Sequence, residues 1–407
     1  EKWETIDDRQ ISKSDQYMAA GGISHRYFFG NNAHLKSTIA ATFSKSKSSQ
    51  DMTTLSDELT PFLTWNNRYA NLIFKSSFNK KFSSRFTNMT GVTYTKLFYN
   101  MDFDMAPHEG YALENISRGD GNTDLISAFN SSLIGLSDKV DLSVGINAQT
   151  MTLNNEWTVE PRASVRWQAS GKSAFAVAYG LYSRMEKMDV YFVKTKGTGE
   201  MANKKLGFTK SHHFMLTYDY KISDDMHLKI EPYAQFLFDV PVIADSSYSV
   251  LNRRDFFVEN PLVNDGKGRN IGVDITFEKY LTKGLYYMVT GSLFSSRYRG
   301  GDGVWHNTRY DRRYIINGLI GKEWMLGRSK QNILSVNLKL TLQGGERHSP
   351  VNVESTMNDP DREVQYDERR AFSEQLSPMF LANYSVSYRI IRTVFYNLHS
   401  LTPLMIC

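Results

Sequence analysis

The chain has 407 residues, a formal net charge of +5, 13% aromatic residues and a single cysteine, Cys407. One cysteine excludes a disulfide framework and a cysteine-based metal site. The Lys and Arg residues are spread along the chain, which excludes the dense basic patch of a nucleic-acid-binding protein. No window of about eighteen residues is wholly apolar, so the sequence predicts no transmembrane helix.

The first residues carry no start methionine, no basic leader and no apolar leader segment. We therefore interpret residues 1–13 as an incoming segment from a part of the protein that precedes Glu1. On this interpretation the chain is a fragment of a longer protein.

From there onward, apolar and polar residues alternate with a period of two in segments of about ten to fourteen residues, which is close to the length of a tilted membrane-crossing strand. In the segment 159–168, Val165 and Trp167 point one way, and Arg162 and Arg166 point the other. The clearest segments are 140–149, 159–168, 228–239, 271–278, 334–343 and 380–390. Aromatic residues gather near strand ends, as in the girdles of membrane barrels. We count about fifteen strands.

The connections also alternate between short and long. Tight turns are predicted at 31–32, 80–81, 137–139, 170–172, 223–225, 282–284 and 327–330. Long connections are predicted at 46–67, 104–122, 185–209, 240–268, 300–311 and 345–378, with only 154–158 brief between strands. Short turns on one rim and long loops on the other are typical of an outer-membrane barrel, with periplasmic turns and extracellular loops. The alternative is a soluble β protein, such as a propeller or a series of sandwiches. No repeat of blade length is present, and the apolar faces of the clearest strands carry none of the charges that a sandwich bounded by water would tolerate there.

Seven short segments follow one another in order along the chain: IEPY at 230–233, DVPVI at 239–243, GKGRNIGVD at 266–274, FEKY at 277–280, GVWHNTR at 303–309, GKEW at 321–324 and QGGER at 343–347. In order and spacing they resemble the C-terminal barrel of Bacteroidetes-type TonB-dependent receptors, of the group with a carboxypeptidase-regulatory-like N-terminal domain. The likeness runs from about Ser14 to about Arg389. It implies an all-β, antiparallel transmembrane barrel of roughly 22 strands, of which residues 14–391 supply about fifteen. Residues 392–407 lack the final aromatic-ended strands of such barrels and read like a shifted frame, so we interpret them as an aberrant or truncated tail.

The resemblance implies import of a scarce nutrient, such as a siderophore, vitamin, glycan or peptide, across the outer membrane. The expected partners are outer-membrane lipid and lipopolysaccharide, the nutrient itself, and the TonB complex through a plug domain outside this chain. Whether a surface lipoprotein caps the receptor stays open. No cofactor is implied.

Two groups of residues are candidates for substrate binding. Inward-facing charged side chains would contact plug or substrate in a polar lumen, or merely pair with one another there: Arg162, Arg166, Lys229, Glu231, Asp274, Glu278 and Lys339. The connection 299–313 is the second group, because Trp and Tyr stack on planar ligands and Arg pairs with anions. Its candidates are Trp305, His306, Arg309, Tyr310 and Arg312, with Asp311 and Arg313 beside them. Packing between loops, or contact with lipopolysaccharide, would explain the same residues.

Other chemistry finds little support in the sequence. His212 and His213 are adjacent in a predicted strand, so they point to opposite faces and cannot chelate one metal ion together. The glycine-rich segment 266–272 precedes a strand instead of a helix, so it offers no phosphate-binding helix N-terminus. No nucleophile elbow or zinc-protease motif occurs, and we predict no enzyme activity. A plugless barrel with an adhesive or structural role, and a hydrolase with catalytic residues on its rim, are the alternatives.

Overall fold

The structure is a computed structural model that describes residues 9–54, 58–108, 110–195, 198–253, 258–327, 330–359 and 364–390. The expected tail 392–407, with Cys407, lies outside the described residues, as do residues 1–8 of the expected incoming segment. The first strand begins at Gln10, inside that segment.

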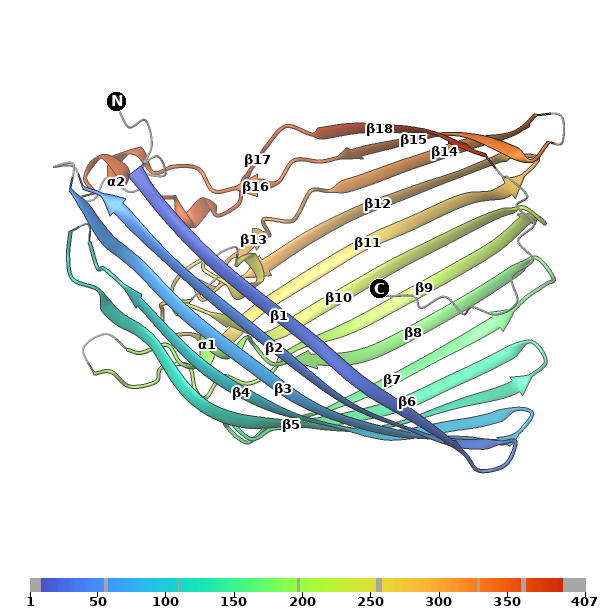
Figure 1. The fold of residues 1–407 in the computed structure, drawn as a ribbon, viewed down its shortest axis with the longest axis horizontal. Helices are drawn as coiled ribbons and strands as arrows, with labels where there is room; N and C mark the ends of the chain where they lie inside the picture. Colours follow the sequence, from blue (N-terminus) through green and yellow to red (C-terminus); the bar gives the residue numbers. More distant parts are fainter. Residues whose placement is uncertain are drawn as a thin grey trace, which may run out of the picture.

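The described part of the chain forms one curved antiparallel wall (Figure 1). Its strands in chain order are β1 (Gln10–Phe28), β2 (Ala33–Thr53), β3 (Leu59–Ser83), β4 (Phe86–Met105), β5 (Glu114–Ser137), β6 (Val140–Met151), β7 (Glu156–Gln168), β8 (Ser173–Arg184), β9 (Thr209–Ser223), β10 (Met226–Val242), β11 (Val263–Thr282), β12 (Leu285–Arg299), β14 (Tyr314–Leu326), β15 (Asn332–Gln343) and β18 (Met379–Arg389). Each pairs with its neighbours in this order, and the short β13 (Trp305–Asn307) pairs only with β12. Among the described residues β1 and β18 do not pair with one another, so the wall is a partial barrel of fifteen consecutive strands, which confirms the predicted fold class and strand number.

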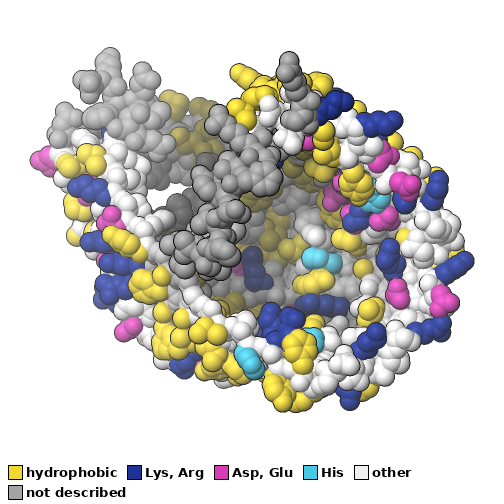
Figure 2. Space-filling view, turned by 45° about the vertical axis from the view of Figure 1, so that its right-hand side comes forward, with side chains coloured by type: hydrophobic (Ala, Val, Ile, Leu, Met, Phe, Trp, Pro, Cys, Tyr) yellow, Lys and Arg dark blue, Asp and Glu magenta, His cyan; other side chains and the backbone are white. Residues whose placement is uncertain are grey.

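The two faces of the wall follow the predicted alternation. On β7, Val165 and Trp167 are 41% and 50% exposed on the outer face, whereas Glu160 on the inner face is 2% exposed. Residues that lie directly opposite one another on antiparallel strands point to the same face of the sheet. The pairing register therefore extends the inner and outer assignment of side chains from each strand to the next. The resulting wall is apolar outside and polar inside, and it encloses a hollow on whose surface Lys, Arg and His side chains are visible (Figure 2). Among the described residues, no helix is long and apolar enough to cross a membrane.

The connections gather at opposite ends of the wall (Figure 1). One end carries the tight turns. The other carries the long connections with α1 (Met188–Tyr191), β13, β16 (Arg347–His348), α2 (Val353–Met357), β17 (Glu374–Gln375) and the 3-10 turns η2 (Val250–Asn252) and η3 (Glu368–Arg370). Near the tight turns the outer face bears an aromatic row, in which Phe175 stacks on Trp167 at 5.7 Å and on Tyr218 at 4.8 Å between ring centroids. Such a row is typical of the interface between a membrane and water.

Four predicted connections and turns are wrong in their extent, and one of them is 240–268, in which residues 240–242 belong to β10 and residues 263–268 to β11. Most of 46–67 is strand, because β2 and β3 pair continuously until residue 53 and from residue 59. Residues 114–122 of the expected connection 104–122 belong to β5, which pairs with β4 there. The predicted turn at Lys80 and Lys81 lies inside β3, and the chain turns instead between Ser83 and Phe86. In these places residues of the expected connections join the wall because a neighbouring strand offers its backbone hydrogen bonds, which composition alone does not reveal. The turn predicted at 327–330 includes Arg328 and Ser329, which lie outside the described residues.

The larger of the two buried apolar clusters lies beneath the long connections. Tyr99 and Met101 from β4 pack with Tyr191, Val193 and other residues of the connection after β8. Tyr191 is fully buried, its hydroxyl accepts a hydrogen bond from the backbone N–H of Glu186 at 3.0 Å, and burial raises its pKa above the usual range. This packing fixes the connection 185–208 against the inner face of the wall.

Candidate ligand-binding site

The connection between β12 and β14 folds back on the wall and is held mostly by internal contacts. His306 is 6% exposed; its Nε2 lies 2.7 Å from a carboxylate oxygen of Asp302 and its ring lies 5.5 Å from that of Tyr298. The backbone N–H of Arg309 donates to the side chain of Asn252 at 3.0 Å, and its guanidinium lies over the ring of Phe372. Two of the predicted binding residues are therefore engaged in fixing the loop.

One buried ion pair ties this connection to the next. The Nε of Arg347 donates to a carboxylate oxygen of Asp311 at 3.0 Å, and the two residues are 6% and 1% exposed. The other oxygen of Asp311 accepts from the backbone N–H of Ser296 at 2.9 Å. The pair thus joins β12, the connection after it and the connection before β18.

Beneath these loops a pocket of about 700 Å³ opens on the inner face. It brings together three of the predicted residues, Asp274 from β11 with Tyr310 and Arg312 from the loop. Tyr310 is 48% exposed, and Arg312 donates to the carboxylate of Glu346. Charge, an aromatic ring and open space coincide here, which is the combination expected of a small-molecule site.

Sequence reasoning did not single out the polar floor of this pocket. Asn270 donates to Gln235 at 3.0 Å and accepts from the hydroxyl of Ser296 at 2.7 Å; Ser296 in turn accepts from Thr308 at 2.8 Å. The hydroxyl and amide groups come from β10, β11, β12 and the following loop. Because side chains alternate along β10, Gln235 lies on the inner face, and the alternation in the sequence could have identified it as a lumen-facing residue.

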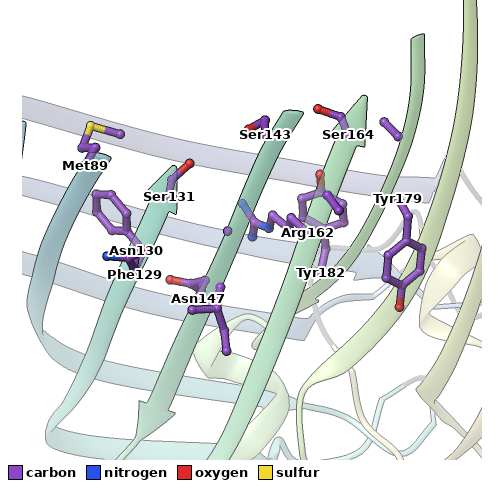
Figure 3. Close-up of a pocket in the computed structure, with 14 residues that line it drawn as sticks. Met89, Phe129, Asn130, Ser131, Ser143, Asn147, Arg162, Ser164, Tyr179 and Tyr182 are labelled. Carbon is purple, nitrogen blue, oxygen red and sulfur yellow. The ribbon is translucent and has the colours of Figure 1, made fainter. Parts of the chain in front are cut away.

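Arg162 lines a second hollow, of about 500 Å³, on the inner face of β4 to β8 (Figure 3). Its Nη2 lies 2.6 Å from Glu160, and its guanidinium lies 4.3 Å from the ring centroid of Tyr182. Glu160 also accepts hydrogen bonds from Gln149 at 2.9 Å and Ser183 at 2.6 Å. The arginine is held in place while its outer edge stays open to the hollow, since 43% of its side chain is exposed.

The other predicted lumen residues do not join either pocket. Lys229 pairs with Glu231 at 2.8 Å, and Glu278 lies 3.3 Å from the ring of His227. Arg166 forms a 3.5 Å hydrogen bond with Gln168, close to a tight turn. These groups form a ladder of inner-face polar contacts nearer the tight turns.

A third hollow was not foreseen. It measures about 1080 Å³ and lies between β1 to β4 and the connection after β8, with Trp65, Tyr69 and Arg184 in its lining. Arg253 closes one side through a 2.7 Å ion pair with Asp189. Trp65 had been placed in an expected loop, which concealed its position on the inner face.

No described group of three or more His, Cys, Asp or Glu residues is arranged to hold a metal ion. His212 and His213 point to opposite faces, as their adjacency in a strand predicts. His212 stacks on Phe238 at 5.1 Å, and His213 lies against Tyr182 at 4.6 Å.

No protein-family model matches the sequence, and no curated protein is similar to it. Solved structures are similar in fold. The ferric yersiniabactin uptake receptor FyuA from Yersinia pestis shares 13% identity at a TM-score of 0.62, covering 92% of this chain and 54% of that one. The ferric-catecholate import receptor Fiu from E. coli K12 shares 11% identity at 0.66, covering 95% and 59%. The pyoverdine outer membrane receptor FpvA from Pseudomonas aeruginosa shares 9% identity at 0.65, covering 92% and 55%.

These likenesses establish the class of fold: the chain forms a partial antiparallel barrel like the walls of outer-membrane receptors. All three solved proteins are receptors. The chain spans little more than half the length of each of them.

Proposed function

We propose that this chain is part of the barrel of a TonB-dependent outer-membrane receptor that imports a scarce nutrient. The observation that carries the proposal is the pocket of about 700 Å³ on the inner face, directly beneath the connection after β12. A transport protein needs such an open polar site inside its barrel, where Tyr310 supplies a ring and Arg312 a charge. The likeness in fold to an uptake receptor, an import receptor and an outer membrane receptor supports the same assignment.

The geometry suggests how the wall would work. The long connections would face the outside of the cell, and a ligand that entered between them would reach Tyr310 and Arg312 before the rest of the lumen. Further inward, the ladder of Lys229, Glu231 and Glu278 would face a plug domain. TonB would pull on that plug, which would move along the polar inner face of the wall. The substrate would be a siderophore, vitamin, glycan or peptide, and the receptor type that of the Bacteroidetes.

The test is uptake by cells that carry the full receptor as their only route for a given nutrient. Accumulation of ⁵⁵Fe-loaded yersiniabactin, enterobactin and pyoverdine, and of labelled cobalamin, would be measured with and without a functional TonB system. We expect accumulation of one probe that disappears when TonB is removed. Uptake of small solutes independent of TonB would instead identify a plugless barrel, and hydrolysis of a probe at the cell surface would identify a rim-active enzyme.

A further inference from the structure

The hollow on the inner face of β4 to β8 presents a cation whose counter-charge is hidden behind it. Among the described residues that line this hollow, Arg162 alone is charged. Its partner Glu160 is 2% exposed and does not belong to the lining. Besides the arginine, three neutral groups donate to that carboxylate: the amides of Asn147 and Gln149 and the hydroxyl of Ser183. The carboxylate is therefore satisfied from several sides, and a further acceptor can approach the guanidinium from the hollow without displacing it.

The space beside Arg162 is made by glycine on both neighbouring strands. Gly145 on β6 and Gly180 on β8 are its direct partners in the sheet, so all three residues lie on the inner face. A Cβ added at Gly180 would lie 2.7 Å from the ring of Tyr182, and the same ring stacks on the guanidinium (Figure 3). Within the described part of the chain the guanidinium forms one hydrogen bond, to Glu160, which leaves its remaining N–H donors available to a ligand.

One row of directly paired residues joins this hollow to the pocket beneath the connection after β12. The row runs from Arg162 through Gly180 on β8, His213 on β9, Gln235 on β10 and Asn270 on β11 to Ser296 on β12. Its last three members form the polar floor of the pocket beneath that connection. Ser296 lies near the end of β12 from which the long connection leaves, whereas Arg162 lies midway along β7. The row therefore leads inward, away from the long connections visible in Figure 1.

The lining of the hollow suits a carboxylate that is attached to an apolar group. A guanidinium binds a carboxylate through paired N–H donors, and such charged hydrogen bonds are stronger than neutral ones. Phe129 and Met89 lie across the hollow from Tyr182, so apolar side chains are present on the side opposite the arginine (Figure 3). The volume of about 500 Å³ is within the usual range of small-molecule sites.

We propose that this hollow is a second, deeper binding site for the substrate, in which Arg162 binds a carboxylate group of that substrate. The substrate would bind first beside Tyr310 and would then pass along the row of paired residues to Arg162. The proposal rests on the proposed function, and it narrows the substrate to molecules that carry a carboxylate. It also separates two roles along the inner face, capture beneath the long connections and a second binding step further inward.

The experiment uses the full receptor, purified from outer membranes and placed in nanodiscs. The probe is labelled benzoate, and benzamide is its neutral analogue of similar shape; binding of both would be measured by equilibrium dialysis. The variant E160Q/R162Q removes the buried pair as a unit, so that no carboxylate is left without its cation. The matched control is K75Q, because Lys75 is a cation on the same face as Asn71 and lines none of the hollows described above.

We expect wild type and K75Q to bind benzoate in preference to benzamide. E160Q/R162Q should bind benzoate at least about tenfold more weakly, which corresponds to about 1.4 kcal/mol. Y310A should keep its affinity for benzoate, because Tyr310 lines the other pocket. The proposal is overturned if wild type does not bind benzoate, if E160Q/R162Q binds it as tightly as wild type, or if benzamide binds equally well. A loss in Y310A as large as that in E160Q/R162Q would also overturn it, since the probe would then bind beneath the connection after β12.

A second variant covers the case in which E160Q/R162Q does not fold. R162K keeps a cation beside Glu160 but lacks the planar fork, so it should also bind benzoate more weakly, and an unchanged affinity would contradict the proposal. Uptake of the iron probes and of cobalamin is measured on the same variants in cells. TonB-dependent uptake without benzoate binding removes this inference alone, whereas benzoate binding with uptake that is independent of TonB removes the receptor assignment alone.

Discussion

Arg347 and Asp311 form an ion pair of 3.0 Å that is almost wholly removed from solvent, although the two residues lie on different connections. Arg347 also donates to the carbonyl of Asp311 at 3.1 Å and to that of Ser373 at 3.3 Å. The guanidinium is thus the element that holds the connection before β18 against the one after β12. The position of these two connections, which cover the inner-face pocket, therefore depends on Arg347.

Replacing Arg347 with Met should release these connections, because the carboxylate of Asp311 would remain buried without its cation. Removing one partner of a buried pair costs about 3–5 kcal/mol. We expect new cleavage sites for added protease in the two connections, with the barrel itself still resistant. Arg313→Met is the control: that side chain is 64% exposed and 4.0 Å from Asp311, so its loss should cost about 0–1 kcal/mol. Identical protease patterns for the two variants would show that the buried ion pair does not fix the two connections over the pocket.

A second prediction concerns the close approach of Gly344 to the same loop. A Cβ added there would lie 1.8 Å from the carbonyl oxygen of Arg312, a backbone atom that cannot move aside alone. Gly344→Ala should therefore shift Arg312 and destabilise the protein by about 1–3 kcal/mol, the usual range for overpacking. Gly318→Ala in β14 is the matched control, because nothing lies within 4 Å of its added Cβ. The measurement is the temperature at which each barrel loses its compact gel mobility, and equal temperatures would contradict the prediction.

The wall could be predicted from the sequence because the alternation of side chains between two faces follows from the covalent geometry of any extended chain. Side chains alternate in any strand, so Val165 outward and Arg162 inward follow from parity once membrane and lumen are distinguished. The extent of the strands could not be predicted. Residues 46–53 are mostly polar, and they continue β2 only because β3 offers a backbone ladder opposite them.

The candidate site was only partly predictable for a similar reason. Asp274, Tyr310 and Arg312 carry chemistry that the sequence displays, but their shared pocket depends on where the loop turns back. The partner of Asp311 is 36 residues away, and no spacing pattern links it to Arg347.

The tight turn between β9 and β10 should respond to acid. Lys279 donates to Asp225 and holds the pKa of that carboxyl well below its usual range, and Lys221 lowers the pKa of Asp224. A carboxyl whose folded pKa is depressed stabilises the fold above its unfolded pKa and loses that contribution as the pH falls through the folded value. The protection factors of the amides in the turn, which are corrected for the intrinsic pH dependence of exchange, should therefore stay constant down to about pH 4 and fall below it. Asp225→Asn should remove most of this acid response, and an unchanged response in that variant would assign it elsewhere.

The ligand pocket yields the sharpest test of the proposed function. Tyr310 is 48% exposed and lines the pocket, so Tyr310→Ala should remove contact with a ligand and leave the fold intact. An aromatic contact of this kind contributes about 0.5–1.5 kcal/mol beyond its buried area, and the buried area adds to that. We expect about tenfold weaker binding of whichever iron probe or cobalamin the receptor takes up. Tyr366→Ala is the control, since Tyr366 is 57% exposed on a long connection and does not line this pocket. Equal losses in both variants would point to the loops in general, whereas a loss confined to Tyr310→Ala would locate binding on the inner face beneath the connection after β12.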